Sequence, residues 1–428
     1  MINSTSSNKK PLVGFFPLFY NLAETGRAVL AAKRYIEHGG QAIFFSHGGE
    51  YEKLARDMGC KVVKVDPIYS EEFIDDLWKY SRLEKMGAPF PEKILREHVE
   101  AELAAYKQTG VELILTTNNF PCSISARVAG IPLISITPKV IGKFTKYPDD
   151  AEFLLTHLIP KLLKLKVLNW YFPRSKIWSR PFNKLAKNYD LPGFHNSSDI
   201  AKGDYTLYTD FLELLQLSES EVTPSEFYIG PIFLDELFNK TLPKGQSDDK
   251  IKQHLQKPGK SILFSLGSSG TKEFFLKVLS TLNKTNYNVI AVYASILSED
   301  ELPVVNDNII LKKFVPSIRE LNHDVDLAIL HGGQGTVYTA AYAGRPVIGF
   351  PMQFEQHLNL EVLVKHGMAR IESRRYFKEQ LFLKAIEDVF DNYDVYLKNA
   401  QKLASRLPKP EGDKNAAGIL LNIIDQGM

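Results

Sequence analysis

The chain has 428 residues, of which 52 are Lys or Arg and 50 are Asp or Glu, so its formal net charge is +2. This length is too great for one ordinary hydrophobic core and predicts two domains, and the balanced charge excludes a broadly basic nucleic-acid-binding protein. The two cysteines, Cys60 and Cys122, are too few for a disulfide framework or a four-cysteine zinc site, which favours a reducing, cytoplasmic compartment.

The N-terminal residues predict no targeting segment. The first ten residues are polar and the apolar run that follows at residues 11–20 is short, whereas a signal peptide needs a charged region first and a small-residue cleavage site after its apolar run. We therefore predict a buried first strand at residues 11–17. Because no stretch of about 18 apolar residues occurs, we expect no membrane-spanning helix.

Short apolar runs alternate with amphipathic stretches through the first half of the chain. Strands are predicted at residues 12–16, 41–46, 60–65, 111–116 and 132–136. Helices are predicted at residues 25–37, 51–58, 92–106 and 122–129. Strands that alternate with helices favour a parallel sheet covered on both faces.

The second half repeats this alternation. Strands are predicted at residues 261–265, 288–293, 309–312, 327–331 and 346–350. Helices are predicted at residues 272–282, 336–343, 359–365 and 377–390, and again within 395–422 around a Pro-rich break. Residues 239–260 have the composition of a linker, so we place the domain boundary there. The predicted fold class is α/β, with two doubly wound Rossmann-like domains that face each other across a cleft.

The most specific feature is the segment at residues 331–336, with the sequence His-Gly-Gly-Gln-Gly-Thr, which follows a predicted strand and opens a predicted helix. A helix N-terminus exposes free N–H groups and a partial positive charge, and glycines let a phosphate approach that backbone closely. Thr336 offers a helix cap or a hydroxyl for a phosphate, and His331 offers a ring N–H. A tight turn beside a buried histidine is the alternative interpretation of the segment in isolation.

The residues after this segment extend it into a longer motif. A Gly-Arg-Pro step occupies residues 344–346, a Phe-Pro pair follows at residues 350–351, and Glu355-Gln356 is followed by Asn359. This order and spacing resembles the sugar-nucleotide motif of the family 1 glycosyltransferases, the UDP-glycosyltransferase and macrolide glycosyltransferase-like enzymes of GT-B fold. Weaker similarities are found at residues 229–231, 265–268 and 314–316.

The resemblance implies a separate task for each part of the chain. Residues 1–240 are expected to bind the acceptor and residues 241–395 the nucleotide-sugar donor, with a helix in residues 396–428 crossing back to the first domain. Phe314 would stack on the base, the Val315 backbone would pair with it, and His331 would hold the diphosphate with the backbone of residues 333–336. Glu355 and Gln356 would bind sugar hydroxyls. The implied donor-binding residues are Gly267, Ser268, Phe314, Val315, His331, Gly333, Gln334, Gly335, Thr336, Glu355 and Gln356.

One position departs from the family pattern. Many UDP-dependent members have a glutamate eight residues after the motif histidine, where it holds both ribose hydroxyls, and this chain has Thr339 there. A threonine offers one hydroxyl in place of two carboxylate oxygens. We favour a UDP-sugar as the donor, and a dTDP-sugar, which lacks the ribose 2′-hydroxyl, is the alternative.

The catalytic pair of the family is also replaced. Its histidine, which deprotonates the acceptor, corresponds by position to Glu24, and the region of its orienting aspartate reads Thr-Thr-Asn-Asn at residues 116–119. A histidine base needs a carboxylate to fix its tautomer, whereas a carboxylate base does not. We therefore take Glu24 as the candidate general base. The alternative is that Glu24 caps or charges the first turn of a helix.

A second His-Gly-Gly sequence occurs at residues 47–49, again after a predicted strand. Glu50 follows directly, which is unfavourable beside a phosphate, so we interpret this segment as a strand-to-helix turn.

Residues 153–189 form a basic, aromatic segment without Asp or Glu. Eight Lys or Arg side chains alternate there with leucines and aromatic residues. Three interpretations stay open: a solvated helix face over a local core, a peripheral contact with an anionic membrane, or a contact with the acceptor.

The predicted function is inverting transfer of a sugar from a nucleoside diphosphate sugar to a hydroxyl of a hydrophobic small-molecule or lipid acceptor. No cofactor, metal or nucleic acid is expected, and the oligomeric state is left open. The alternatives are a nucleotide-sugar epimerase of the same fold and a nucleotide-sugar binding protein that has lost catalysis, which the missing histidine and aspartate keep open.

Overall fold

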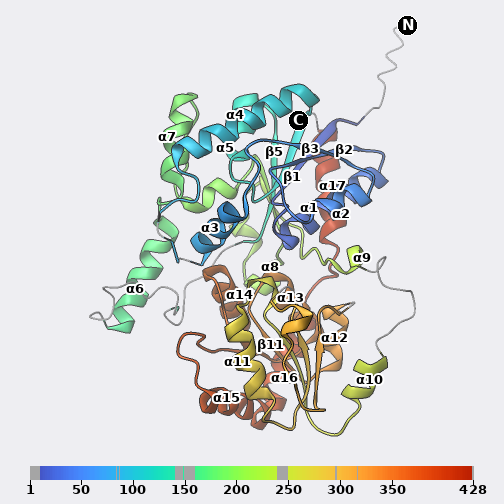
Figure 1. The fold of residues 1–428 in the computed structure, drawn as a ribbon. Coiled ribbons are helices and arrows are strands. Elements are labelled where there is room, and N and C mark those ends of the chain that lie inside the picture. The colour runs from blue at the N-terminus through green and yellow to red at the C-terminus, as the bar shows by residue number, and fades with distance from the viewer. Residues whose placement is uncertain are drawn as a thin grey trace.

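The computed structural model describes residues 10–82, 84–85, 87–139, 148, 160–238, 249–294, 296–315 and 317–426. Figure 1 shows that these residues form two lobes, each built around one sheet with helices on both faces. The strands of both sheets pair in parallel. The predicted fold class, two doubly wound α/β domains, is therefore confirmed.

The first lobe contains a sheet whose described strands run in the order β3-β2-β1-β4-β5-β6-β7. The strands are β1 (Leu12–Pro17), β2 (Gln41–Ser46), β3 (Lys61–Lys64), β4 (Leu113–Thr117), β5 (Leu133–Thr137), β6 (Tyr205–Tyr208) and β7 (Glu226–Tyr228). The helices are α1 (Leu22–Glu37), α2 (Glu52–Asp57), α3 (Glu71–Ser81), α4 (Glu92–Thr109), α5 (Cys122–Ala129), α6 (Lys161–Tyr171), α7 (Ser179–Asn188), α8 (Leu212–Leu215) and α9 (Asp235–Phe238).

The second lobe contains a sheet of order β10-β9-β8-β11-β12-β13. The strands are β8 (Ser261–Ser265), β9 (Asn288–Val292), β10 (Ile309–Lys312), β11 (Leu327–Leu330), β12 (Val347–Gly349) and β13 (Ala369–Ile371). The helices are α10 (Asp249–Leu255), α11 (Lys272–Leu282), α12 (Ile318–Asp324), α13 (Gln334–Ala343), α14 (Phe354–Lys365), α15 (Glu379–Asp391) and α16 (Tyr393–Ala404). The last helix in chain order is α17 (Gly412–Asp425), which does not belong to this lobe.

Several elements differ from the sequence prediction. The strands β6, β7 and β13 were not predicted, because their sequences, Tyr-Thr-Leu-Tyr, Glu-Phe-Tyr and Ala-Arg-Ile, form no continuous run of aliphatic residues. Part of the predicted linker is α10, since Ile251 is buried against the second sheet. Residues 239–248 of that linker lie outside the described part of the chain.

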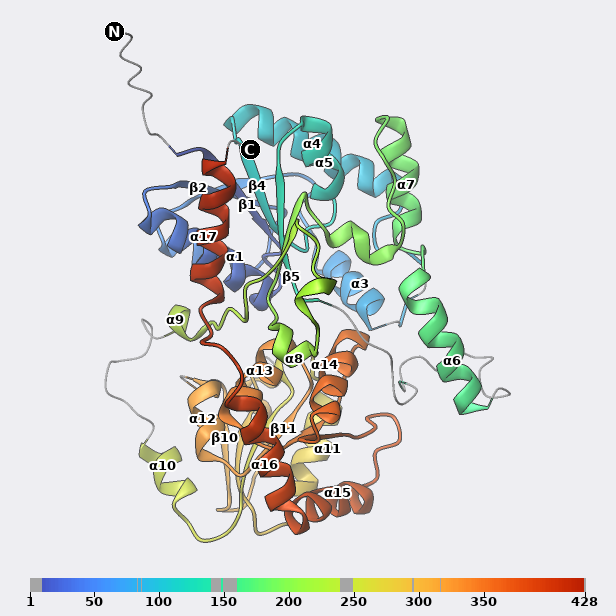
Figure 2. The same cartoon turned by 180° about the vertical axis from the view of Figure 1, so that it is seen from behind.

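The last helix, α17, lies in the first lobe beside α1, far from α16, which lies in the second (Figures 1 and 2). Its buried residues Ala416, Leu420 and Ile423 recur at helical spacing and join the same core cluster as the apolar face of α1. The side-chain amide of Asn415 donates to the Ile229 carbonyl over 2.9 Å, which fixes the start of α17 against the first lobe.

Truncation of Leu420 tests this packing. Because Leu420 is fully buried, we expect Leu420→Ala to lower the free energy of unfolding by about 2–5 kcal/mol in urea titrations. The matched control is Leu381→Ala on α15, whose leucine is 57% exposed and should change stability by no more than about 0.5 kcal/mol. Equal unfolding midpoints for the two variants would show that α17 adds nothing to the core of the first lobe.

Candidate functional site

The glycine-rich loop lies between β11 and α13, as the sequence predicts. The helix begins at Gln334, its N-cap is Gly333, and no side chain caps its first N–H groups. Thr336 does not cap the helix, because it is the third helical residue and its hydroxyl donates to the Gly333 carbonyl over 2.8 Å. The first N–H groups of α13 and the partial positive charge at its N-terminus are therefore not neutralised by a capping side chain.

His331 is enclosed by two glycine turns. A Cβ on Gly333 would lie 2.4 Å from His331 Nε2, and one on Gly267 would lie 2.5 Å from His331 Cε1. Both positions therefore require glycine, and Gly267 also has a left-handed φ of +57°. Burial lowers the pKa of His331 to about 4, so the ring is neutral at physiological pH. Its Nδ1 has no hydrogen-bond partner among the described residues.

The sugar motif lies at the start of α14. This helix begins at Phe354, five residues before the start of the helix predicted there at residues 359–365. Glu355 Oε1 accepts a hydrogen bond from Asn359 Nδ2 over 2.8 Å, and burial raises the pKa of this carboxyl group. Gln356 Oε1 accepts from the Met352 N–H, and its Nε2 donates to Ser269 Oγ over 3.0 Å. Gln356 thus connects α14 to the turn at Gly267, and the same segment that carries the motif shapes the loop around His331.

Two further predicted positions flank the loop. Phe314 is 61% exposed just beyond β10, whereas Val315 packs partly on the core of the second lobe. The Ser268 side chain lies outside the described part of the chain. Thr339 is buried, and its hydroxyl donates to the Thr336 carbonyl and accepts from Asn322 Nδ2. The hydroxyl at the position of the ribose-binding glutamate is therefore already bonded within the protein.

Glu24 lies in the first turn of α1, at the interface between the lobes. The helix is capped by Asn21, whose Oδ1 accepts from the N–H of Ala23 and of Glu24, so Glu24 is not the cap. The Glu24 side chain is buried, and its Oε1 accepts from Arg27 Nη1 over 2.9 Å. Its Oε2 is buried and has no partner among the described residues.

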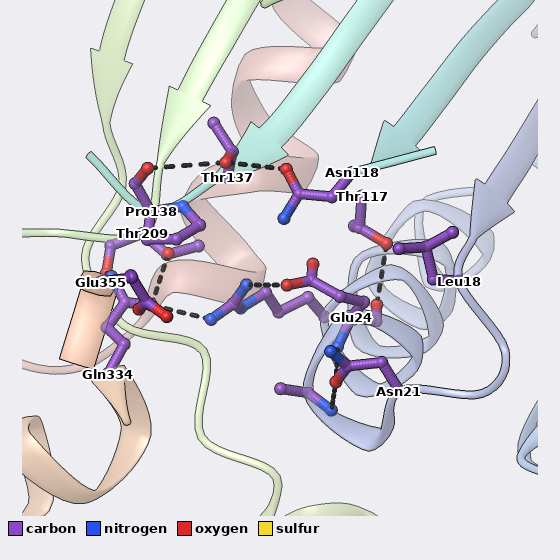
Figure 3. Close-up of polar contacts among 12 residues, drawn as sticks. Leu18, Asn21, Glu24, Thr117, Asn118, Thr137, Pro138, Thr209, Gln334 and Glu355 are labelled. Carbon is purple, nitrogen blue, oxygen red and sulfur yellow. Dashed lines mark hydrogen bonds and ion pairs between the residues drawn. The ribbon is translucent and has the colours of Figure 1, made fainter. Parts of the chain in front are cut away.

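Residues 116–119, at the position of the family aspartate, contain no carboxylate, and one of them donates a hydrogen bond to α1. Thr117 Oγ1 donates to the Glu24 carbonyl over 2.9 Å. Asn118 adopts a left-handed φ of 58°, and its Oδ1 accepts from Thr137 Oγ1 (Figure 3). Asn119 turns away and donates to Glu102.

A buried hydrogen-bond network joins Glu24 to Gln334, which follows the glycine-rich loop at the start of α13 (Figure 3). Arg27 Nη2 donates to Gln334 Oε1 over 2.8 Å, and Thr209 Oγ1 donates to the same oxygen over 2.8 Å. Gln334 Nε2 donates to Asp210 Oδ1 over 2.8 Å, and burial raises the pKa of Asp210. Sequence analysis missed Arg27, Thr209 and Asp210. The last two follow β6 directly, so prediction of that strand would have marked them as polar residues at a strand end.

The second His-Gly-Gly sequence forms a turn, in agreement with its interpretation from the sequence. His47 is buried, its Nδ1 lies 3.0 Å from the Val65 carbonyl, and its Nε2 lies 3.3 Å from Glu102 Oε1. Both ring nitrogens are therefore engaged within the first lobe.

The described residues contain no group of three or more His, Cys, Asp and Glu side chains that could hold a metal ion. Within the same ranges, no helix combines the length and apolar character needed to cross a membrane.

The chain is similar to known glycosyltransferases. Residues 261–415 match the glycosyltransferase family 28 C-terminal domain. The chain is 24% identical over 390 residues to a PGL/p-HBAD biosynthesis rhamnosyltransferase of Mycobacterium bovis (strain BCG / Pasteur 1173P2), covering 88% of this chain and 81% of the relative. The chain is a glycosyltransferase of the GT-B fold.

Solved structures of other glycosyltransferases share its fold. The calicheamicin glycosyltransferase CalG4 superimposes with a TM-score of 0.67 at 15% identity, over 98% of this glycosyltransferase and 99% of CalG4. The spinosyn rhamnosyltransferase SpnG, solved in complex with thymidine diphosphate, gives a TM-score of 0.61 at 11% identity, with 96% and 99% covered. The predicted resemblance to the family 1 enzymes of GT-B fold is thus confirmed at the level of fold and enzyme class.

Protonation of His331 gives the loop a testable pH dependence. The folded pKa is about 4 and the ordinary value is 6.5, so the unfolded chain binds a proton that the folded chain does not. Stability should therefore fall as the pH decreases from 6.5 to 4. Between pH 7 and pH 4.5, the free energy of unfolding should fall by about 2 kcal/mol less in His331→Asn than in the wild type.

Urea unfolding at both pH values measures this effect. His195→Asn, at an exposed position, is the control and should keep the wild-type pH dependence. A wild-type pH dependence in His331→Asn would contradict a lowered pKa for the loop histidine.

Proposed function

We propose that this glycosyltransferase moves a sugar, with inversion, from a nucleoside diphosphate sugar to a hydroxyl of a hydrophobic acceptor. The observation that carries the proposal is the uncapped N-terminus of α13 beside the enclosed, neutral His331, whose Nδ1 lacks a partner among the described residues. Diphosphate oxygens suit such donors. Negative charge grows on the diphosphate as the sugar bond breaks, and donors that are already in place stabilise it there.

The other donor roles follow from the residues around this loop. The exposed ring of Phe314 is available for stacking on a base, with the backbone of Val315 beside it. Glu355 and Gln356 lie at the N-terminus of α14, and the turn at Gly267 is bonded to Gln356 through Ser269. We assign Glu355 to the sugar hydroxyls, with Gln356 as a second contact that also holds the loop.

We assign Glu24 as the general base. Its Oε1 is held by Arg27, which leaves Oε2 to accept a proton. In the proposed step, Oε2 takes the proton of the acceptor hydroxyl, and the acceptor oxygen forms a bond to the anomeric carbon. The bond from that carbon to the diphosphate oxygen breaks, and its electron pair leaves with the nucleoside diphosphate.

Two observations favour a thymidine diphosphate sugar over the UDP-sugar preferred from the sequence. The Thr339 hydroxyl is hydrogen-bonded to Asn322 and to the Thr336 carbonyl. At the position of the ribose-binding glutamate, the chain therefore has no carboxylate, and the hydroxyl present there is already used within the protein. The similar SpnG structure was solved with thymidine diphosphate. A deoxyribose lacks the 2′-hydroxyl and needs fewer partners at this position.

The exposed face of α6 favours a lipid acceptor reached at a membrane surface. Its large apolar side chains are exposed, with Leu162 at 77% and Trp170 at 63%. The described residues from 160 to 189 contain no Asp or Glu, and α6 stands away from both lobes (Figures 1 and 2). Apolar anchors among basic residues suit an anionic lipid surface. Residues 153–159 of the basic segment lie outside the described part of the chain.

Acceptor-dependent release of nucleotide tests the reaction and the base together. With dTDP-glucose and UDP-glucose as donors and a phenolic acceptor, we expect release that requires the acceptor and is faster with the dTDP donor. Because Glu24→Gln removes the proton acceptor, it should lower this release by about 10²–10⁴-fold. Donor affinity, measured by calorimetry, should stay within about threefold, because the diphosphate site is unchanged.

The matched control is Glu50→Gln, which alters an exposed carboxylate of the same lobe and should keep wild-type release. Full transfer activity in Glu24→Gln would refute the base assignment. Donor binding without turnover in the wild-type protein, for every acceptor tried, would refute transfer itself.

Vesicle binding tests the proposed membrane contact. We expect sedimentation with vesicles of phosphatidylcholine and phosphatidylglycerol that weakens steeply as salt rises, since a Debye length is about 10 Å at 0.1 M salt. The double variant Leu162→Glu and Trp170→Glu should reduce binding about tenfold or more, because it places charge on the apolar face. The control is Val395→Glu on α16, a 61% exposed position in the other lobe. No binding at any salt concentration would exclude the contact.

A further inference from the structure

Arg27 stands where the two lobes meet. It is buried on α1, one turn after Glu24, and both terminal nitrogens of its guanidinium are used. Nη1 donates to Glu24 Oε1 over 2.9 Å, and Nη2 donates to Gln334 Oε1 over 2.8 Å. The planar guanidinium therefore fixes the distance between the proposed base in one lobe and the first residue of the donor helix in the other. Figure 3 shows Glu24 and Gln334 approaching from these two elements.

Three carboxyl groups from separate segments gather near this guanidinium. Glu24 belongs to α1, Asp210 follows β6, and Glu355 begins α14. Burial raises the pKa of Asp210 and of Glu355, whereas the positive charge of Arg27 lowers the pKa of both groups. Charges of one sign brought together in a buried place destabilise one another unless a cation compensates them. Arg27 is the cation that these carboxyl groups have in common.

The partners of Gln334 leave little freedom in this arrangement. Its Oε1 accepts from Arg27 and from Thr209, and its Nε2 donates to Asp210 and to the Thr209 carbonyl over 3.0 Å. The amide thus uses its oxygen and its nitrogen on residues of the first lobe. The backbone of the same residue opens α13, where the diphosphate is proposed to bind. A displacement of Arg27 would therefore reach both the base and the donor loop.

We propose that Arg27 is a positioning residue that holds the Glu24 carboxylate and, through Gln334, the donor loop in one fixed geometry. This inference rests on the proposed role of Glu24 as the base. It assigns to one side chain two effects that separate variants can distinguish. Loss of the contact with Glu24 affects the proton-transfer step, whereas loss of the contact with Gln334 affects the donor.

The test compares Arg27→Met, Arg27→Lys and Gln334→Ala in steady-state transfer over a range of pH. We expect Arg27→Met to lower kcat about 10²-fold, because a misplaced catalytic group costs about that much. Loss of the cation should also shift the acid limb of the kcat profile to higher pH, because the charge of Arg27 lowers the pKa of Asp210 and of Glu355 and its removal lets them bind protons more readily. The titratable groups that face one another here are Glu24, Asp210, Glu355, Tyr20, Tyr338, Tyr228 and Lys139. Arg27→Lys keeps the charge and should restore the pH profile and part of kcat.

Gln334→Ala breaks the link to the donor loop and leaves the contact with Glu24. We expect it to raise the donor KM about tenfold and to keep kcat within about threefold. Arg56→Met on α2 is the control, since Arg56 pairs with Glu52 near the surface, and it should match the wild type in all readouts. Thermal melting of each variant identifies loss of folding, and Arg27→Lys keeps the test valid if Arg27→Met fails to fold.

Three results overturn the inference and are distinguishable from one another. If Arg27→Met keeps the wild-type kcat and pH profile while Glu24→Gln is inactive, the positioning role fails and the proposed function stands. If Glu24→Gln keeps full transfer, the base assignment and the inference fail together. An equal loss of melting temperature in Arg27→Met and Arg27→Lys, with both pH profiles as in the wild type, would show a purely structural role and also overturn it.

Discussion

Parallel strand direction is the constraint on which the site depends. Every strand of a parallel sheet ends at the same edge, and both faces of the sheet are covered by helices, so polar side chains gather beyond the strand ends. Thr117 ends β4, Thr209 and Asp210 follow β6, and His331 follows β11. The two sheets turn these edges toward each other, as the bonds from Gln334 to the first lobe show.

Charge in this interface is balanced with few groups. His331 is kept neutral by burial, so the donor loop relies on backbone N–H groups and the helix dipole rather than on a formal positive charge. The carboxyl groups of Glu24 and Asp210 lie across from it in the first lobe, and Glu355 lies beside it on α14. Arg27 donates to Glu24, and its charge favours the ionised form of the other two. A dianionic diphosphate would therefore meet the positive end of α13, and an acceptor hydroxyl would meet the carboxylate side.

The described part of the basic segment contacts the start of α14. The ring of Phe172, which follows α6, stacks on Phe354 at the start of α14 with 5.6 Å between centroids. Glu355 is the next residue along the chain. The residue that follows α6 is thus in contact with the start of the helix that carries the sugar motif.

Periodicity and motif spacing in the sequence determined the fold class, most strand positions and the place of the glycine-rich loop between a strand and a helix, because these depend on residues close together in the chain. The strand β6 escaped prediction, since its sequence Tyr-Thr-Leu-Tyr mixes polar and apolar residues and forms no continuous apolar run. Only the tertiary structure decided that Arg27 contacts Gln334, 307 positions away, and that Asn21 rather than Glu24 caps α1. The contact between Arg27 and Gln334 depends on how the two sheets face each other, and local sequence does not encode that arrangement.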